Sequence, residues 1–371
     1  MIGSFSRGWQ PRQWLRKTLR YTVLAVLLVG AIATLGVAPA QAGLAQGNAI
    51  TDPAAILRYA LPIDNDEVRD LQKSLEELSV GLRTKRWSLI NGNLKAARRS
   101  LKYGDADILA SIPAERQSQA QQLLDELTTG IENLFTNAEA KDISAIWTLR
   151  GQLLAQVSEL EQLMVTDFPF TVPAEYAALP QLKGRATVEL ETNKGTMAIV
   201  ADGYNAPVNA GNFVDLVERG FYDGQTFFQN QDYIIQTGDP PGADVGFNDP
   251  KTGEYRAIPL EVRVQEEVEP IYEFTLEDVG YYLPNLALPF NAYGAVALAR
   301  PGDDPNGGSS QFFFFLFDSE LTPPGFNVLD GRYSVFGYLV EGKDVLENLE
   351  GGDKILSAKV VAGLENLVEP T

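Results

Sequence analysis

Apolar residues recur every three or four positions between residues 53 and 164, which is the spacing of a buried helix face. We expect four longer helices and a short one, over 64–82, 87–104, 113–134, 143–164 and 53–59. Asp64 with Glu67 three residues later forms a capping-box pattern, and Pro113 is typical of a helix start. Short connections favour antiparallel neighbours, so residues 43–164 are predicted to form an all-α helical bundle. Loops interrupt the periodicity about every 20 residues, which favours a bundle core over a leucine zipper.

The pattern changes after the bundle. Pro169, Pro173 and Pro180 fall within a short stretch, which favours an extended, semi-rigid connection over residues 165–184. From residue 185 onward, apolar and polar positions alternate with the period of two that is typical of half-buried strands. We therefore place a domain boundary at this connection.

Residues 185–371 contain many predicted strands and two short helices. The stretch "RATVELETNKGTMAIVA" predicts a hairpin that turns at Asn193, and the segment from Pro207 predicts a helix. A second helix is expected over residues 343–349. Many strands with few helices predict a closed antiparallel β-barrel capped by helices.

The first 42 residues show the three parts of an export signal. A basic stretch, "RQWLRKTLR", precedes the apolar run "YTVLAVLLVGAIATLGVA", and small residues at Ala40 and Ala42 mark a cleavage site. The run is shorter than the ~20 residues of a spanning helix, which favours cleavage over a retained membrane anchor. We expect an exported protein without stable membrane insertion after cleavage.

Composition excludes several kinds of chemistry. The chain has 371 residues with no cysteine and no histidine, which excludes disulfides, thiol nucleophiles, a histidine base and imidazole metal ligands. No spaced acidic loop of the calcium-binding type occurs, so we expect no metal and no cofactor. The formal net charge is −19, which opposes binding to nucleic acid.

Five stretches of the second domain carry a resemblance when they are read in order. They are "NFVDLVERGFYDG", "YIIQTGDP", "GAVALAR", "GSSQFFFFL" and "VLDGRYSVFGYLVEG". Together they resemble a cyclophilin domain over residues 185–367. The export signal, acidic bundle, proline-rich connection and long segment "PLEVRVQEEVEPIYEFTLEDVGYYLPNLALPFNAYG" resemble the multidomain thylakoid-lumen cyclophilins of plants and cyanobacteria.

The resemblance implies a peptidyl-prolyl cis-trans isomerase. It implies a location in the thylakoid lumen, with the periplasm as the alternative, and a role as a folding or assembly factor of photosystem II. The expected partners are proline-containing polypeptide segments, such as lumenal loops of photosystem II proteins.

The resemblance also implies roles for individual residues. It makes Gln236 and Gln311 the polar groups that orient the substrate, beside Gln229 at the position of the catalytic arginine. The substrate-binding residues that it implies are Tyr233, Ile234, Ala299, Arg300, Phe313, Val328, Leu329 and Tyr333. Val328 stands where the family has a tryptophan, and Tyr333 where it has a histidine. We assign the neighbouring Phe312, Phe314 and Phe315 to the core.

Gln229 is the departure with the largest expected effect. It can donate a hydrogen bond to the prolyl nitrogen, but without charge, and charge-assisted bonds are roughly twice as strong as neutral ones. A difference of ~1.4–3 kcal/mol would slow the reaction about 10- to 100-fold. We therefore expect reduced activity. For Arg300 we expect an ion pair with Asp303 or Asp304 rather than a substitute catalytic role.

Two alternatives remain open. The domain is a catalytically silent chaperone or scaffold that holds clients with its groove and bundle, or the bundle is a lid over the groove. The roughly 20-residue connection is long enough for the second, at up to ~3.3 Å for each residue.

Overall fold

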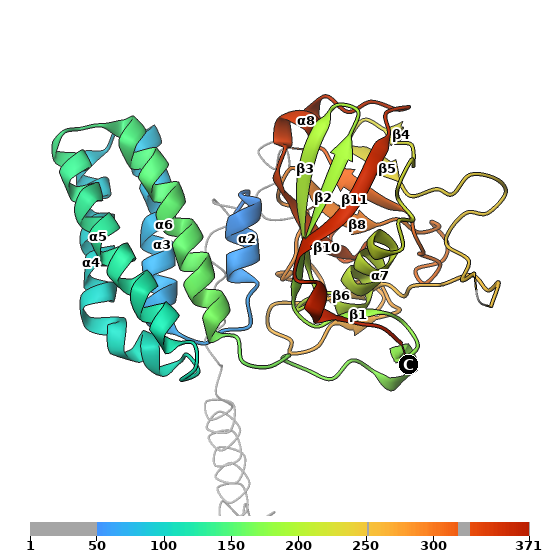
Figure 1. The fold of residues 1–371 in the computed structure, drawn as a ribbon, viewed down its shortest axis with the longest axis horizontal. Coiled ribbons are helices and arrows are strands. Elements are labelled where there is room, and N and C mark those ends of the chain that lie inside the picture. The colour runs from blue at the N-terminus through green and yellow to red at the C-terminus, as the bar shows by residue number, and fades with distance from the viewer. Residues whose placement is uncertain (1–49, 251, 318–326, 371) are drawn as a thin grey trace, which may run out of the picture. The chain divides into compact units, whose positions relative to one another are not determined.

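The computed structural model describes residues 50–250, 252–317 and 327–370 (Figure 1). The expected export signal over residues 1–42 lies outside these ranges. Residues 48–371 form one compact unit. Within the described ranges, every helix is too short or too polar to cross a membrane.

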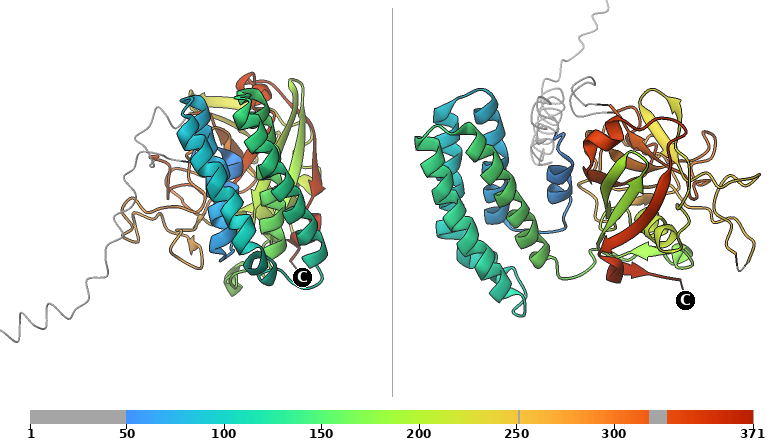
Figure 2. Two further views of the ribbon diagram at one scale, coloured as in Figure 1. Left: turned by 90° about the vertical axis from the view of Figure 1, so that its left-hand side faces the viewer. Right: turned by 45° about the horizontal axis from the view of Figure 1, so that its top comes forward.

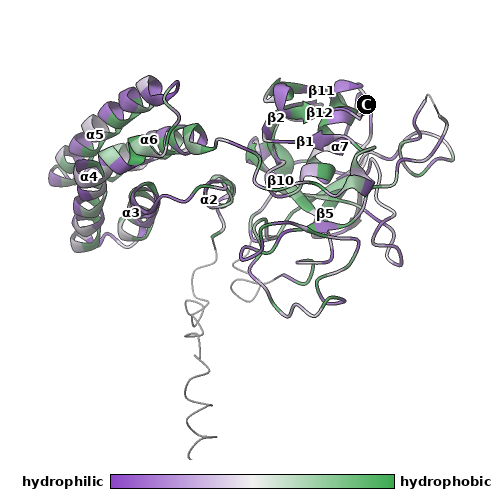
Figure 3. Cartoon of the chain, turned by 90° about the horizontal axis from the view of Figure 1, so that it is seen from below, coloured by the Kyte–Doolittle hydropathy of each residue, from purple (hydrophilic) through white to green (hydrophobic). Residues whose placement is uncertain are grey.

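The N-terminal part of the described chain is helical, as predicted. Its helices are α2 (Pro53–Tyr59), α3 (Asp66–Arg83), α4 (Trp87–Ala110), α5 (Gln117–Glu139) and α6 (Ile143–Met164). The apolar residues of α3 to α6 share one buried core, against which Trp87 and Trp147 pack partly buried. The helices α3 to α6 lie side by side (Figure 2). Polar and apolar residues are interleaved along them, so each presents an apolar face to the bundle (Figure 3).

Three predicted helix ends were wrong. The α3 helix begins at Asp66, two residues later than expected, because the side chain of Asn65 accepts the backbone N–H of Val68 and caps the helix. The α4 helix continues past Gly104, where the missing side chain lets Glu67 approach within 2.7 Å of an ideal Cβ position. Pro113 lies in a turn that precedes α5.

The short helix α2 contacts both the bundle and the second domain. Arg58 forms an ion pair of 3.0 Å with Glu76 of α3. On the other side, Ile56 and Leu57 belong to the core of the second domain, and Asn205 donates to the carbonyl of Ala60 at 3.0 Å. The α2 helix therefore belongs physically to both parts.

The second domain is built on an eight-stranded antiparallel sheet, with order β11-β2-β3-β10-β8-β9-β5-β4. The strands are β2 (Arg185–Thr192), β3 (Gly195–Asp202), β4 (Phe228–Gln231), β5 (Ile234–Thr237), β8 (Ala295–Leu298), β9 (Phe312–Phe315), β10 (Val335–Glu341) and β11 (Ile355–Ala362). Two further pairs are β1 (Gln181–Leu182) with β12 (Leu367–Val368), and β6 (Glu261–Val262) with β7 (Ile271–Tyr272). Single 3-10 turns occur at Ala174–Tyr176 and Leu364–Asn366.

The predicted closed barrel is not confirmed. In the described residues, the two edge strands β11 and β4 do not pair along a ladder. An isolated bridge between Thr226 and Lys354 joins the sheet edges, and the backbone N–H of Phe227 donates to the carbonyl of Asp353 at 2.8 Å. The sheet is thus a curled half-barrel whose edges meet beside β4 and β11.

Two helices complete this domain, α7 (Pro207–Glu218) and α8 (Lys343–Glu347). The α7 helix packs its apolar face onto the sheet, where the ring of Phe213 lies 5.2 Å from that of Phe312 and 5.1 Å from that of Phe336. These rings form much of the core beneath the strands that carry the candidate site.

A buried carboxylate anchors the long excursion between β5 and β8. Glu261 accepts hydrogen bonds from the backbone N–H groups of Val208 and Asn209 in the first turn of α7, at 3.1 and 2.8 Å. Burial raises the pKa of Glu261 to about 6, against the effect of these bonds. A carboxylate at a helix N-terminus interacts favourably with the helix dipole, so this residue ties the excursion to the domain.

Candidate functional site

Three adjacent strands place the candidate site residues on one face. Gln236 of β5 lies directly opposite Phe313 of β9, and Phe313 lies opposite Ala297 of β8. Because successive side chains of a strand point to opposite faces, Ile234 and Gln236 share a face, whereas Ile235 points into the core. In "YIIQ" and "QFFFF", alternate side chains therefore point toward the candidate site and the side chains between them point into the core.

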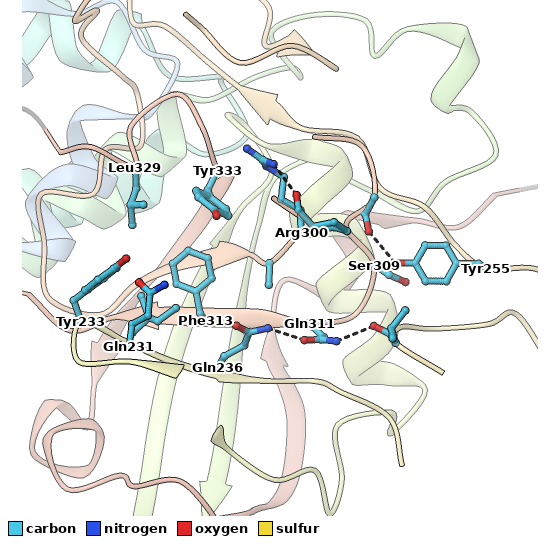
Figure 4. Close-up of a pocket in the computed structure, with 15 residues that line it drawn as sticks. Gln231, Tyr233, Gln236, Tyr255, Arg300, Ser309, Gln311, Phe313, Leu329 and Tyr333 are labelled. Atoms are coloured by element: carbon cyan, nitrogen blue, oxygen red, sulfur yellow. Dashed lines mark hydrogen bonds between the residues drawn. The ribbon is translucent and has the colours of Figure 1, made fainter. Parts of the chain in front are cut away.

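This face borders a cavity of about 330 Å³ (Figure 4). It is lined by Gln231, Tyr233, Ile234, Gln236, Val245, Tyr255, Ala299, Arg300, Pro301, Gly307, Ser309, Gln311, Phe313, Leu329 and Tyr333. One end is mainly apolar and the other mainly polar. A small concave site with an apolar slot and a few placed polar groups is the usual form of a ligand site.

The apolar end is built from stacked rings. Phe313 is 3% exposed, and its ring is parallel to that of Phe290 at 6.0 Å, with an angle of 4° between the planes. Tyr333 meets Phe313 edge-on, at 5.5 Å and 87°. These contacts fix the floor and one wall of an apolar slot.

A short turn forms the rest of that wall. Leu329 projects from it into the cavity, and Asp330 holds it by accepting the backbone N–H groups of Phe290 and Asn327, each at 2.9 Å. Burial raises the pKa of Asp330 to about 6, although both hydrogen bonds lower it. The carboxyl thus connects the wall to the segment that carries Phe290.

The polar groups of the cavity form a chain. The amide of Gln236 donates to Gln311 Oε1 at 2.6 Å, and the amide of Gln311 donates to Asp239 Oδ1 at 2.9 Å and to the carbonyl of Val245 at 2.8 Å (Figure 4). Gln311 is therefore held by three partners. Gln236 keeps a free carbonyl oxygen and one N–H among the described contacts, which leaves it able to bind a peptide.

The comparisons with known proteins match both parts of the chain. Residues 52–165 match the family described as peptidyl-prolyl cis-trans isomerase CYP38-like, PsbQ-like domain, and residues 187–363 match cyclophilin type peptidyl-prolyl cis-trans isomerase/CLD. A thylakoid lumen peptidyl-prolyl cis-trans isomerase of Synechocystis sp., sll0408, is 62% identical over 326 residues, which cover 88% of this chain and 86% of the relative. The chain belongs to the cyclophilin-type peptidyl-prolyl cis-trans isomerases.

Two plant relatives are also similar to this chain over most of its length. The chloroplastic isomerase CYP38 of Arabidopsis thaliana is 42% identical over 346 residues, covering 90% of this chain and 79% of the relative. The chloroplastic isomerase CYP37 of the same plant is 33% identical over 340 residues, covering 85% and 70%. Similarity that spans both parts shows that the helical domain and the cyclophilin domain occur together in this group.

Most of the predicted site residues line the cyclophilin groove. They are Tyr233, Ile234, Gln236, Ala299, Arg300, Gln311, Phe313, Leu329 and Tyr333. Their roles in binding stay predictions. Phe312, Phe314 and Phe315 are buried and do not line the cavity, in agreement with the core assignment.

Val328 does not line the groove. Its side chain is 80% exposed, while its neighbour Leu329 lines the cavity. The cause is the local turn, in which Asn327 Oδ1 accepts the backbone N–H of Leu329 at 3.0 Å, so that these two consecutive side chains point in different directions.

The side chain of Gln229 lies outside the described set, and its predicted role stays a prediction. The register of its strand is known: Phe228 pairs with Gln236 and Gln231 pairs with Ile234, so β4 has one more residue than β5 between these pairs. Such a bulge re-aims side chains, and it is Gln231 that lines the cavity. The whole strand, "FQNQ", carries no charge.

The expected pairing of Arg300 with Asp303 or Asp304 is wrong. Its guanidinium instead donates to the carbonyl oxygens of Pro301 and Arg332. Pro301 is the next residue after Arg300, whereas Arg332 lies in the segment before β10, so the two carbonyls hold Arg300 at the groove from both segments.

The sequence reasoning missed six lining residues. Ser309 lies two positions before Gln311, outside strand β9, so the resemblance that pointed to Gln311 and Phe313 did not extend to it. Val245 and Tyr255 belong to the long excursion, and Tyr255 donates to the carbonyl of Gly307 at 2.8 Å. Nothing local in the sequence predicts that contact, because it joins segments about 50 residues apart.

Proposed function

We propose that this isomerase works slowly, as a folding and assembly factor for proline-containing segments in the thylakoid lumen. The lumenal location is supported by the name of the Synechocystis relative, and the chloroplastic names of the plant relatives agree with it. Lumenal loops of photosystem II proteins are the proposed clients, on the basis of the resemblance to thylakoid-lumen cyclophilins. The periplasm is the alternative location.

The observation that carries the slow rate is the uncharged strand β4 beside a groove that is otherwise complete. Rotation about an X-Pro bond crosses a barrier of ~18–20 kcal/mol that amide resonance sets. Only interactions that strengthen in the twisted transition state lower this barrier. The N–H of Gln236 that remains free can hold the substrate carbonyl side while Gln311 fixes this amide, but β4 offers only neutral donors toward the prolyl nitrogen.

A protease-free isomerisation assay on a short X-Pro peptide tests this proposal with residues 43–371. We expect a rate above the uncatalysed one. Gln231→Arg and Gln229→Arg each place a cation on β4, and we expect one of them to raise kcat/KM by about tenfold or more, because a charge-assisted bond replaces a neutral one. Gln231→Glu is the matched control, which adds a charge of the wrong sign and should give no gain.

An uncatalysed rate in the wild type and in both arginine variants would reject the isomerase proposal. The same uncharged strand favours the second candidate, a silent chaperone that binds extended segments without turning them over. Equilibrium binding of proline-containing peptides by a chain with no measurable turnover would support that candidate, and absence of binding would reject both.

A further inference from the structure

The cyclophilin groove of this acidic protein holds a single charged side chain among its described lining residues, and this side chain is a cation. Arg300 lines the cavity with neutral neighbours. The chain as a whole has a formal charge of −19, and without its first 42 residues it has 25 basic and 49 acidic residues. A lone arginine in such a groove is unlike the rest of the surface.

Arg300 is held close to the expected proline slot. Its guanidinium carbon lies 4.8 Å from the centre of the Tyr333 ring, and Tyr333 in turn meets Phe313 edge-on (Figure 4). The cation is thus one aromatic ring away from the floor of the slot. Cation–π contact and stacking fix a planar guanidinium in place, which reduces the ordering cost of binding.

The guanidinium is only partly satisfied. Its Nε and Nη2 donate to the carbonyl of Arg332 at 3.0 and 2.8 Å, and its Nη1 donates to the carbonyl of Pro301 at 2.8 Å. An arginine has five N–H donors, so these three bonds leave one donor on each terminal nitrogen. Within the described residues no carboxylate pairs with Arg300, whereas the side chain of Arg332 pairs with Glu277 at 2.8 Å.

The other end of the groove has the opposite polarity. The carboxylate of Asp239 accepts from Gln311 there, at 2.9 Å. A bound acidic side chain is therefore attracted near Arg300 and repelled near Asp239. The groove is electrically asymmetric along the path of a peptide.

We propose that Arg300 selects client segments that carry Asp or Glu beside the proline, on one side of it only. The free donors on Nη1 and Nη2 receive the two carboxylate oxygens, while the proline lies against Phe313. The inference rests on the proposed binding of X-Pro segments in this groove. Acidic segments are selected although the whole protein is negative, because at physiological salt charges beyond ~8 Å are largely screened and the nearby guanidinium dominates.

The experiment is a positional scan. Short peptides have a central proline and four test positions, two before the proline and two after it. Each peptide carries Glu or Gln at one of these positions. Their dissociation constants are measured by titration with residues 43–371 near physiological salt, and their isomerisation by NMR exchange. We expect Glu to bind about three- to tenfold more tightly than Gln at a position on one side of the proline only, the range for a partly exposed charged pair.

Variants assign the preference to its source. Arg300→Gln should bring the Glu-to-Gln affinity ratio to about one, whatever it does to overall affinity, and Arg300→Lys should keep a ratio above one because it retains the charge. Arg332→Gln, which removes a nearby cation that does not line the cavity, should keep the wild-type ratio.

Three outcomes would overturn the proposal. A ratio of one at every position in the wild type, with Gln peptides still bound, rejects the acidic preference and leaves the proposed function standing. A preference that survives in Arg300→Gln places its source elsewhere. Failure of all peptides to bind rejects the groove function and the preference together.

Discussion

At the scale of single residues, the groove depends on which neighbours hold each functional group. Gln236 faces the cavity because Gln311 accepts its amide, and Gln311 is in turn fixed by Asp239. The sequence identified both glutamines by type and position. It could not show that they contact each other, because that contact depends on the pairing of β5 with β9.

Gln311→Leu should lower kcat/KM by up to about tenfold, since it leaves the amide of Gln236 without its partner and such a bond contributes about 0.5–1.5 kcal/mol. The measurement is isomerisation kinetics with the unfolding midpoint recorded alongside. Asp239→Asn keeps an oxygen that can accept from Gln311, so it should lower kcat/KM less than Gln311→Leu does. Equal losses in both variants would contradict the chain of contacts.

At the scale of elements, periodicity predicted most of the helices and strands but not their ends or their bulges. Helix α3 begins at a cap made by Asn65, and α4 runs through Gly104 because Glu67 packs against the glycine. The bulge in β4 is set by its pairing with β5. The bulge depends on a tertiary contact, which is why the sequence did not identify Gln231 as a lining residue, whereas the direction of Val328 depends on the local turn at Asn327.

The turn that carries Leu329 should make stability depend on pH through Asp330. Burial raises its native pKa from 3.8 to about 6, so between these values the native state binds the proton more tightly than the unfolded state does. The stabilisation is complete below pH ~4 and is lost as pH rises through about 6. From pH 4 to 7 the wild type should lose about 1–3 kcal/mol of unfolding free energy that Asp330→Asn does not lose.

Urea unfolding of both proteins measures this difference at about pH 4, 5, 6 and 7, which together span the range in which Asp330 is expected to titrate. If Asp330→Asn lost more unfolding free energy than the wild type as the pH rises, the carboxyl would not be buried as described. Parallel pH profiles would show that its pKa is close to that of the unfolded chain.

At the scale of the whole molecule, α2 joins the helical and cyclophilin parts. The sequence predicted the helix and the two domains, but it assigned the helix to the bundle alone. Ile56 is 4% exposed within the core of the cyclophilin domain, and Arg185 of β2 donates to the carbonyl of Leu57. The described residues that line the cavity all come from the cyclophilin domain. The interpretation of the bundle as a lid over the groove therefore stays a prediction.

Ile56→Ala should destabilise the cyclophilin domain although it lies more than 100 residues from that domain's first strand. Removal of a buried isoleucine side chain costs about 2–5 kcal/mol. The measurement is urea unfolding followed by near-UV circular dichroism of the tyrosines. Val80→Ala, at a 45% exposed position of α3, is the control and should change the unfolding free energy by less than about 0.5 kcal/mol. Equal effects would show that α2 does not stabilise the sheet.

The placement of the tryptophans has a practical consequence for spectroscopy. The sequence has four tryptophans, of which Trp9 and Trp14 precede residue 43, so the tryptophans of residues 43–371 are Trp87 in α4 and Trp147 in α6. Indole emission therefore reports on the helices alone, and a peptide that enters the groove should leave it unchanged. Unfolding of the helical part can therefore be followed by indole emission in the same sample in which a whole-chain signal is recorded.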